Sequence, residues 1–203
     1  RRIVDKSNGL IPVMYEYDSC YKKSSKKLNL IPLPVNLKSI SCDPNNIKDK
    51  IVVFHGLSRY GFKGTRHVEN AFKVLKEKYP NDLELIINGK MPLKEYLKAL
   101  KQSNIVIDQV NSYSLGMNGL FALAMGKVVL GGAEKESLKS QGIKNSPVIN
   151  VLPSKESIIE AIDFLVKDKN KILSIGERGR KFVETHHCAL KIAKKYENTW
   201  NIN

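Results

Sequence analysis

Residues 51–65 read IVVFHGLSRYGFKGT, an apolar run that passes into a stretch with three glycines, a serine, an arginine and a lysine. Downstream, apolar residues recur at helical spacing, namely Val68, Ala71, Phe72, Leu75 and Tyr79. This spacing predicts an amphipathic helix that ends at Pro80 and Asn81. The segment therefore has the form of a buried strand over 51–55 whose end, rich in glycine and cations, leads straight into a helix.

The same strand-then-helix order recurs along the chain. We expect further strands at 83–87, 105–107, 128–130 and 148–151. Helices are expected from Pro92, around 117–124, at 134–141 and after Ser154. Each strand is short and continuously apolar, as in strands that are covered on both faces. Strand–helix repetition with short links predicts right-handed crossovers and an α/β fold with a doubly wound, parallel, Rossmann-like sheet.

The two ends of the chain differ from this repeat. Residues 170–202 are expected to be helical, with a break near 186–188. At the start, an expected strand at 9–14 and a short helix at 15–23 precede NLIPLPVNL, whose two prolines predict a stiff, extended connector. Because the chain opens without methionine, we expect a fragment of a longer protein. Three parts are expected: the remnant of a preceding domain with its linker (1–31), a Rossmann-like domain (32–185) and a C-terminal helix (186–203).

Composition excludes several classes of protein. The share of apolar residues is ordinary, and no apolar run is long enough to span a bilayer. The three cysteines lie far apart and form no CxxC pair, which argues against a disulfide framework or a zinc site and fits a reducing cytoplasm. The four histidines form no HExxH motif. We therefore expect no metal site.

The chain is strongly basic, with 34 Lys and Arg against 20 Asp and Glu and a net charge of +14. The simplest interpretation is a solvated, lysine-rich surface. The functional interpretations are phosphate-bearing ligands, contact with an anionic membrane, and nucleic acid. Nucleic acid ranks last and is not expected as a partner, because the sequence has no RNP motif, zinc finger or dense arginine cluster with interleaved aromatics.

In doubly wound sheets, ligands bind at the carboxyl ends of the strands. The first such end contains Gly56, Ser58, Arg59, Lys63 and Gly64. Glycines allow close approach of the backbone, and the following helix start adds free N–H groups to the two full charges. The set suits a diphosphate, and a glycine-rich turn with two solvated cations is the open alternative. The segment matches neither the GxGxxG nor the Walker A motif.

Three other strand ends carry candidate residues. These are Asn88 and Gly89; Ser114, Gly116, Met117 and Asn118 within DQVNSYSLGMNG; and Glu134 within GGAEKE. Hydroxyls, amides and a helix start in the second group suit an anion. The alternatives are a capping loop, with Ser112 or Ser114 as the N-cap, and a Glu134 that caps its own helix. His55, at the first strand end, is expected to be structural.

The ordered set of segments resembles the C-terminal domain of retaining GT-B glycosyltransferases of the group 1 type (family 4). HGLSRYGFKGT resembles the loop that holds the donor diphosphate, NGKMPLKEYLKALKQSNIVIDQ the region that holds the nucleoside base, and GMNGLFALAMGKVVLGG the EAMAxGKPVV segment. The final helix, with Tyr196 and Trp200, resembles the helix that crosses back to the first domain. The resemblance covers residues 32–202, and VDKSNGLIPVMYEY is similar to the end of the N-terminal domain.

The resemblance implies transfer of a hexosyl group from a nucleotide-diphosphate sugar, with residues 32–185 as the donor-binding domain. Arg59 and Lys63 would be catalytic, because they neutralise charge on the departing diphosphate, and no metal or other cofactor would be needed. A glycan or lipid-linked acceptor would lie on the missing N-terminal domain, so that the isolated chain binds without turnover. Many relatives build capsule or lipopolysaccharide, which implies a bacterial cytoplasmic enzyme. The basic surface permits peripheral contact with an anionic membrane, which would place the enzyme at the inner face of the cell membrane.

The sequence departs from this family at one place. The family often has two glutamates with seven residues between them, and alignment puts Tyr113 and Phe121 at those positions. Donor contacts are therefore expected from the backbone around residues 114–118, from hydroxyls and amides, or from Glu134. Two alternatives remain open: a catalytically lapsed relative that serves as a binding or scaffold protein, and a GT-B-type nucleotide-sugar epimerase.

Overall fold

The computed structural model describes residues 2–201, which contain a five-stranded sheet with all strands parallel and the order β2-β1-β3-β4-β5. The strands are β1 (Ile51–Leu57), β2 (Leu83–Gly89), β3 (Ile105–Ile107), β4 (Val128–Gly131) and β5 (Ile149–Asn150). Crossovers between neighbouring strands and the reversal of strand order after β2 are those of a doubly wound sheet. The predicted α/β, Rossmann-like class is confirmed.

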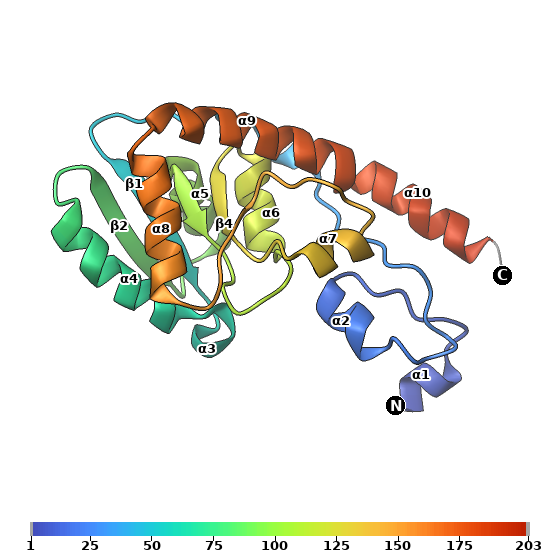
Figure 1. Ribbon diagram of the computed structural model, residues 1–203. Coiled ribbons are helices and arrows are strands. Elements are labelled where there is room, and N and C mark those ends of the chain that lie inside the picture. The colour runs from blue at the N-terminus through green and yellow to red at the C-terminus, as the bar shows by residue number, and fades with distance from the viewer. Residues whose placement is uncertain (1, 202–203) are drawn as a thin grey trace.

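Helices connect the strands and form both ends of the chain (Figure 1). They are α1 (Arg2–Lys6), α2 (Tyr15–Cys20), α3 (Tyr60–Lys63), α4 (Thr65–Lys78), α5 (Leu93–Gln102), α6 (Met117–Ala124), α7 (Lys135–Ser140), α8 (Lys155–Val166), α9 (Lys169–His186) and α10 (Ala189–Trp200). The side chain of Ser154 caps α8, as expected, by accepting a hydrogen bond from the N–H of Ser157. The helical tail is confirmed for the residues that the structure describes.

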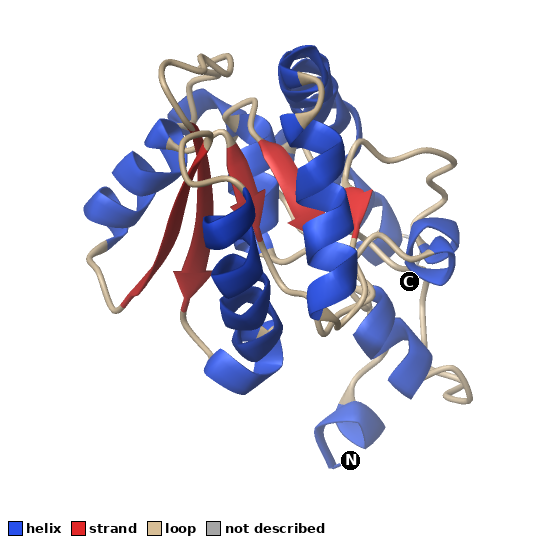
Figure 2. Ribbon diagram, turned by 60° about the vertical axis from the view of Figure 1, so that its left-hand side comes forward, coloured by secondary structure: helices blue, strands red, loops and turns tan. Residues whose placement is uncertain are grey.

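The sheet is covered on both faces, which explains its continuously apolar strands (Figure 2). Alternate residues of one strand enter different cores: Val53 faces the core shared with α4 and α8, and Phe54 faces the core shared with α5 and α6. Helix α9 contributes Ile172 and Ile175 to the first core and Val183 to the second, and it packs on α6. At one point its Gly176 lies directly against the turn at Gly126.

Strand β2 is longer than the sequence suggests. Asn88 and Gly89, expected to end the strand, are its last two residues and pair with Gly56 and Leu57 of β1. A Cβ atom at position 89 would lie 2.0 Å from the backbone oxygen of Leu57. Only glycine, which has no Cβ atom, allows β1 and β2 to lie this close at position 89.

The strand expected at 9–14 is absent from the described residues. Leu10 forms one isolated bridge, donating its N–H to the oxygen of Lys26 and accepting from the N–H of Leu28. Further along, the oxygen of Pro12 accepts the N–H of Ile31 at 3.0 Å, but Pro12 has no N–H with which to complete a ladder. The short helix expected at 15–23 is α2, which ends at Cys20.

The segment around Pro32 and Pro34 has no regular secondary structure apart from an isolated bridge at Val35, and it is firmly packed. Val35 is fully buried, donates its N–H to the oxygen of His187 at 2.7 Å, and accepts from the N–H of Ala189 at 3.0 Å. The break expected near 186–188 lies at this contact, with His187 as the C-cap of α9. The connector thus joins the sheet domain through the junction of the two last helices.

Because of His187, we expect the free energy of unfolding to fall in acid. Burial lowers the pKa of this histidine to about 4, while its Nδ1 lies 2.9 Å from the oxygen of Leu33. The folded state then binds fewer protons than the unfolded state, in which the pKa is about 6.5. Stability contributed by neutral His187 is therefore fully present above pH 6.5 and is lost progressively as the pH falls towards 4, by about 3 kcal/mol in total.

Urea denaturation at several pH values between 7 and 4 checks this expectation. His187→Gln should reduce the slope of unfolding free energy against pH by up to one proton, about 1.4 kcal/mol per pH unit. An unchanged slope in His187→Gln would contradict the burial of a neutral imidazole.

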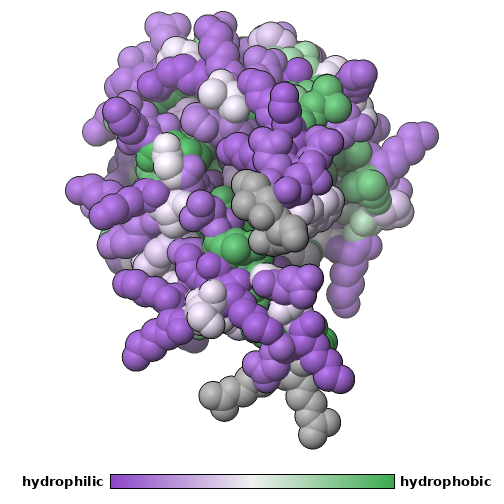
Figure 3. Space-filling view, turned by 90° about the vertical axis from the view of Figure 1, so that its right-hand side faces the viewer, coloured by the Kyte–Doolittle hydropathy of each residue, from purple (hydrophilic) through white to green (hydrophobic). Residues whose placement is uncertain are grey.

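One face of the surface is drawn by hydropathy in Figure 3. Seen from the end that carries α10 and the N-terminal segment, it is largely hydrophilic, with apolar residues scattered (Figure 3). None of the helices within residues 2–201 has the length and apolar character needed to cross a bilayer.

Candidate functional site

A cavity of about 380 Å³ lies at the carboxyl edge of the sheet, beyond β1 and β3. The loop after β1, the loop after β3, the start of α6 and the segment around α2 form its walls. Of the residues predicted from sequence, those that line it are Ser58, Arg59, Lys63, Gly116, Met117 and Asn118. Parallel strand ends meet at one edge, which is why segments more than fifty residues apart in the chain converge here.

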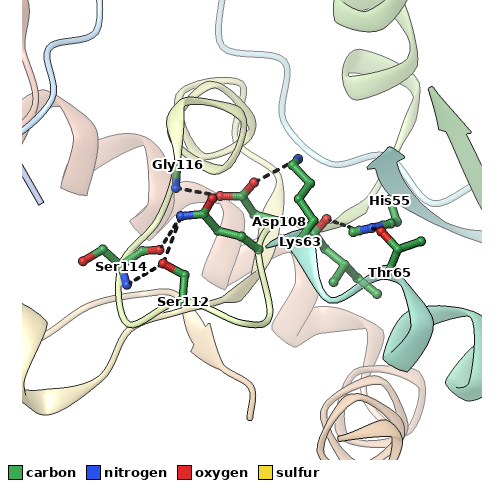
Figure 4. Close-up of polar contacts among 9 residues, drawn as sticks. His55, Lys63, Thr65, Asp108, Ser112, Ser114 and Gly116 are labelled. Carbon is green, nitrogen blue, oxygen red and sulfur yellow. Dashed lines mark hydrogen bonds and ion pairs between the residues drawn. The ribbon is translucent and has the colours of Figure 1, made fainter. Parts of the chain in front are cut away.

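The centre of the site is a buried ion pair. Lys63, the last residue of α3, places Nζ 3.4 Å from Oδ1 of Asp108, and the two side chains are 4% and 1% exposed. The other oxygen, Oδ2, accepts the N–H of Gly116 at 2.8 Å (Figure 4). A Cβ atom at Gly119 would lie 2.8 Å from this same oxygen. Gly119 thus leaves the space that the Asp108 carboxylate occupies.

This arrangement corrects the expected cap of α6. Gly116 is at the N-cap position, and the carboxylate of Asp108 accepts a hydrogen bond from its N–H. Neither Ser112 nor Ser114 therefore caps the helix. A carboxylate is stabilised by the positive end of a helix. It also occupies part of the helix start that a bound anion would use. Lys63 is therefore held in a buried ion pair. The alternative of a glycine-rich turn with two solvated cations is wrong for this lysine.

Arg59 is the exposed cation of the site. It precedes α3 as its N-cap residue and stacks its guanidinium over the ring of Phe62, with 4.3 Å from Cζ to the ring centroid. Ser58 beside it is exposed too. Stacking on an aromatic ring leaves the guanidinium edge, with its donors, free to contact an anion.

The predicted glycines of the first loop have structural roles in this fold. A Cβ atom at Gly56 would lie 2.6 Å from the ring of Tyr96, so this glycine makes room for that side chain. Gly64 adopts φ +70°, ends α3 and begins α4, in a backbone conformation that favours glycine. Neither residue lines the cavity, and the same holds for Asn88, whose Oδ1 accepts the N–H of Gly89 at 2.7 Å.

Two polar candidates also lie outside the cavity lining. Ser114 is 2% exposed; its N–H donates to Glu16 and its hydroxyl lies 2.8 Å from that of Ser137. Glu134 stands at the N-cap position of α7 without capping it, because its Oε1 accepts from the side-chain amide of Asn150 at 3.0 Å. The expectation that Glu134 caps its own helix is therefore wrong.

His55 is structural, as expected. It is fully buried, with Nδ1 2.9 Å from the oxygen of Ile107 and Nε2 3.0 Å from the hydroxyl of Thr65 (Figure 4). A carbonyl can only accept, so Nδ1 carries the hydrogen and Nε2 accepts from Thr65. Burial lowers the pKa of this histidine, which keeps the ring neutral. His55 thus ties β1, β3 and the start of α4 together.

Among the residues of the site that sequence reasoning missed are Asp108, Gln109 and Glu16. Asp108 and Gln109 follow directly on the apolar run of β3, and polar residues at a strand end were the signal that could have found them. Gln109 is buried and donates to the hydroxyl of Ser112 at 3.1 Å and to the oxygen of Ser114 at 3.0 Å. Glu16 comes from α2, and no local pattern marks it. Among the described residues, no group of His, Cys, Asp and Glu is placed to hold a metal ion.

Comparison by sequence finds neither a matching family model nor a matching curated protein. Comparison by structure finds glycosyltransferases. HepE from Anabaena, solved in complex with UDP and glucose, matches with a TM-score of 0.76 at 11% identity, over 100% of this chain and 65% of that one. Sucrose-phosphate synthase from Thermosynechococcus elongatus matches with a TM-score of 0.71 at 17% identity, over 100% and 61%.

A third match is to a single domain. The C-terminal domain of LpcC, a glycosyl transferase group 1 family protein from Francisella tularensis, has a TM-score of 0.55 at 17% identity, over 74% of this chain and 97% of that one. The chain thus has the fold of the C-terminal part of GT-B glycosyltransferases, which confirms the resemblance at the level of fold. It spans less than two thirds of the HepE and sucrose-phosphate synthase chains.

Proposed function

We propose that this chain is the donor-binding domain of a glycosyltransferase that moves a sugar from a nucleoside-diphosphate donor to a glycan acceptor. The observation that carries the proposal is the cavity at the carboxyl edge of the sheet, where Arg59, Lys63 and the start of α6 come together. The fold supports it, since HepE shares the fold and has been solved with UDP-glucose. Two cations and a helix start are the groups that suit a diphosphate.

In this proposal the exposed Arg59 makes the principal contact with the diphosphate. Lys63 lies beside the diphosphate in its pair with Asp108. Asp108 accepts the N–H of Gly116, so the N–H groups that the α6 start offers are those of Met117 and Asn118. Together they stabilise charge on the departing diphosphate, which is electrostatic catalysis that needs no metal or other cofactor. The remaining predicted residues shape the loops around the cavity: Gly56, Gly64, Asn88, Gly89, Ser114 and Glu134.

The acceptor, a glycan or lipid-linked glycan of bacterial capsule or lipopolysaccharide, binds on a preceding domain, in the cytoplasm and at the inner face of the membrane. Transfer is of a hexose, with retention. The 203-residue chain alone then binds donor but does not transfer sugar. Transfer by this chain alone would contradict that division of labour.

Arg59→Ala tests the proposal with little disturbance of the fold, because Arg59 is exposed and has no ion pair among the described residues. Calorimetric titration with UDP, GDP, ADP and CMP should show binding of one diphosphate to the wild type. Loss of the Arg59 contact should weaken it about tenfold or more, as for a charge-assisted hydrogen bond. The thermal midpoint should stay at the wild-type value.

The matched control is Arg178→Ala, which removes another exposed arginine, on α9 and outside the cavity lining. It should bind as the wild type does. No binding of any nucleotide by the wild type, or equal loss in both variants, would contradict the proposed site.

One observation favours the alternative of a catalytically lapsed relative. Tyr113 is 49% exposed and Phe121 packs against the second core, and neither lines the cavity. The positions aligned with the family's two glutamates therefore supply no carboxylate. Transfer assays on the full-length protein, with Arg59→Ala beside it, separate the two functions: sugar transfer that depends on Arg59 excludes the lapsed relative.

A further inference from the structure

A second cavity lies at the opposite edge of the sheet from the candidate donor cavity. Its volume is about 930 Å³, and its walls come from the segment before β1, the first halves of β1 and β2, the end of α5 and the turn before β4. These are the amino ends of the parallel strands. Of the residues that the structure describes, none lines both cavities. A ligand in the second cavity would therefore not displace a donor.

The charged residues of the second cavity are mostly lysines. Five lysines line it against three carboxylates, which leaves an excess of two positive charges. One of the carboxylates, Asp43, is engaged by Lys101, whose Nζ lies 3.8 Å from Oδ2. The other two, Asp49 and Glu84, are exposed to solvent. The lysines are Lys48, Lys50, Lys98, Lys101 and Lys127.

Lys127 is the unusual member of this set. It follows the turn at Gly126 and is only 3% exposed, although lysine is almost never buried without a partner. Within residues 2–201 its Nζ has neither a hydrogen bond nor an ion pair. The ionisable groups that act on this ammonium are Asp43, Cys42 and Lys101, and the first and last of these line the same cavity. The ammonium thus lies among the residues of the cavity wall.

The ammonium of Lys127 is recessed but not sealed from solvent. Among the described residues, the sealed side-chain polar atoms that have no partner belong to Glu16, Tyr96 and Asp163, and Nζ of Lys127 is not one of them. Since Nζ has no partner in the chain, its donors are open to the cavity. Burial lowers the pKa of Lys127, against the opposing effect of Asp43. A cation in this position is costly unless an anion pairs with it.

We propose that the second cavity binds a small, soluble molecule with a phosphate group, and that this phosphate pairs with the ammonium of Lys127. A lysine ammonium binds phosphate as a point charge with three donors. Lys48 and Lys98 line the same cavity, are exposed and have no ion pair among the described residues, so they can contact the same anion. The volume suits a small ligand. A recessed ammonium favours a soluble ligand over the headgroups of a bilayer.

Titration of the 203-residue chain with inorganic phosphate, followed by ¹H–¹⁵N NMR, tests this site. The backbone amide signals of Asn104 and Lys127, two residues of the cavity wall, should shift and saturate. Lys127→Met should weaken this binding about tenfold or more, because a charge-assisted hydrogen bond is lost. Arg59→Ala should show the wild-type shifts, since Arg59 lies at the other edge of the sheet.

The matched control is Lys144→Met, which removes an exposed lysine outside both cavities and should bind phosphate as the wild type does. Lys127→Met should also keep or raise the thermal midpoint in phosphate-free buffer, because it removes a buried charge that has no partner. A second variant, Lys48→Met with Lys98→Met, changes exposed positions alone and keeps Lys127. It should weaken phosphate binding too, and it tests the site even if Lys127→Met does not fold.

Four results would overturn the proposal. The first is the absence of shifts at about 10 mM phosphate, where even a millimolar site is largely filled. The second is equal affinity in the wild type and in both lysine variants. The third is loss of the shifts in Arg59→Ala, which would assign the phosphate to the donor cavity. The fourth is Lys127-dependent binding to phosphatidylglycerol vesicles without any response to free phosphate, which would assign the cavity to a lipid headgroup.

The inference does not depend on the proposed function. Nucleotide binding with no phosphate response at Asn104 and Lys127 contradicts the inference and leaves the proposed function intact. A phosphate response there in a chain that binds no nucleotide has the opposite meaning: the second cavity is a site, and the proposed donor site is wrong.

Discussion

Replacing Lys63 by alanine is expected to lower the free energy of unfolding by about 3–5 kcal/mol and to abolish nucleotide binding. The stability loss follows from Asp108, whose side chain is 1% exposed and would be left as an unpaired charge inside the protein. The binding loss has two causes. One of the two cations of the cavity is removed, and the uncompensated carboxylate at the start of α6 repels a diphosphate.

Urea denaturation and calorimetric titration with the nucleotide that the wild type binds measure the two effects separately. The matched control for stability is Lys78→Ala, which breaks an ion pair with Asp163 whose lysine is 45% exposed and should change stability little. Unchanged stability in Lys63→Ala would contradict the buried ion pair.

A double variant distinguishes folding from function. In Lys63→Met with Asp108→Asn the buried charges disappear together, and the asparagine oxygen still accepts the N–H of Gly116. Stability should return to within about 1–2 kcal/mol of the wild type, since neutral replacements of a buried pair are well tolerated. Nucleotide binding should remain weak, because the cation is still missing. Recovered binding in this variant would exclude Lys63 from the donor site.

Gly176→Ala is expected to destabilise the fold by about 3 kcal/mol, although alanine is the better helix former. A Cβ atom at this position of α9 would lie 2.2 Å from the backbone oxygen of Gly126, and 3.0 Å from the side-chain nitrogen of Asn45. The gain in helix propensity is at most about 1 kcal/mol. A backbone oxygen in a turn between α6 and β4 cannot move aside as a flexible side chain can, so the clash outweighs the gain.

The control for this prediction is Gly61→Ala, since a Cβ atom at position 61 meets nothing within 4 Å. Urea denaturation should show a lower midpoint for Gly176→Ala and little change for Gly61→Ala. If both variants unfold at the wild-type midpoint, α9 does not lie as close to the turn as the structure has it.

The strands and most helices followed from local patterns in the sequence. Continuous apolar runs such as 105–107 predicted buried strands, and helical spacing predicted α4 from its apolar residues alone. The strand expected at 9–14 was wrong because the segment forms only an isolated bridge at Leu10, and Pro12 cannot donate the hydrogen bond that would continue it. Asn88 and Gly89 were predicted to end the strand before them. In the structure both residues pair with β1 and belong to β2.

The place of the site was also predictable, in part. Parallel strands put their carboxyl ends at one edge, so cations after β1 and a helix start after β3 had to lie near each other. That reasoning predicted that Arg59, Lys63 and residues 116–118 lie close together, and all of them line the cavity. It says which segments meet but not which side chains point at one another. Ser114 and Glu134 were predicted from the same edge and have partners elsewhere.

The sequence by itself determined the order of strands and helices, the class of the fold and the edge at which the candidate site lies, because each depends on the local distribution of apolar and turn residues. Only the tertiary structure decided that Lys63 pairs with Asp108, 45 residues away, and that Glu16 meets Ser114, 98 residues away. Such contacts depend on the distances between packed elements and on side-chain direction. In the unfolded chain a carboxylate is hydrated and pairs with no particular distant residue. Folding removes the water and places one specific donor beside it.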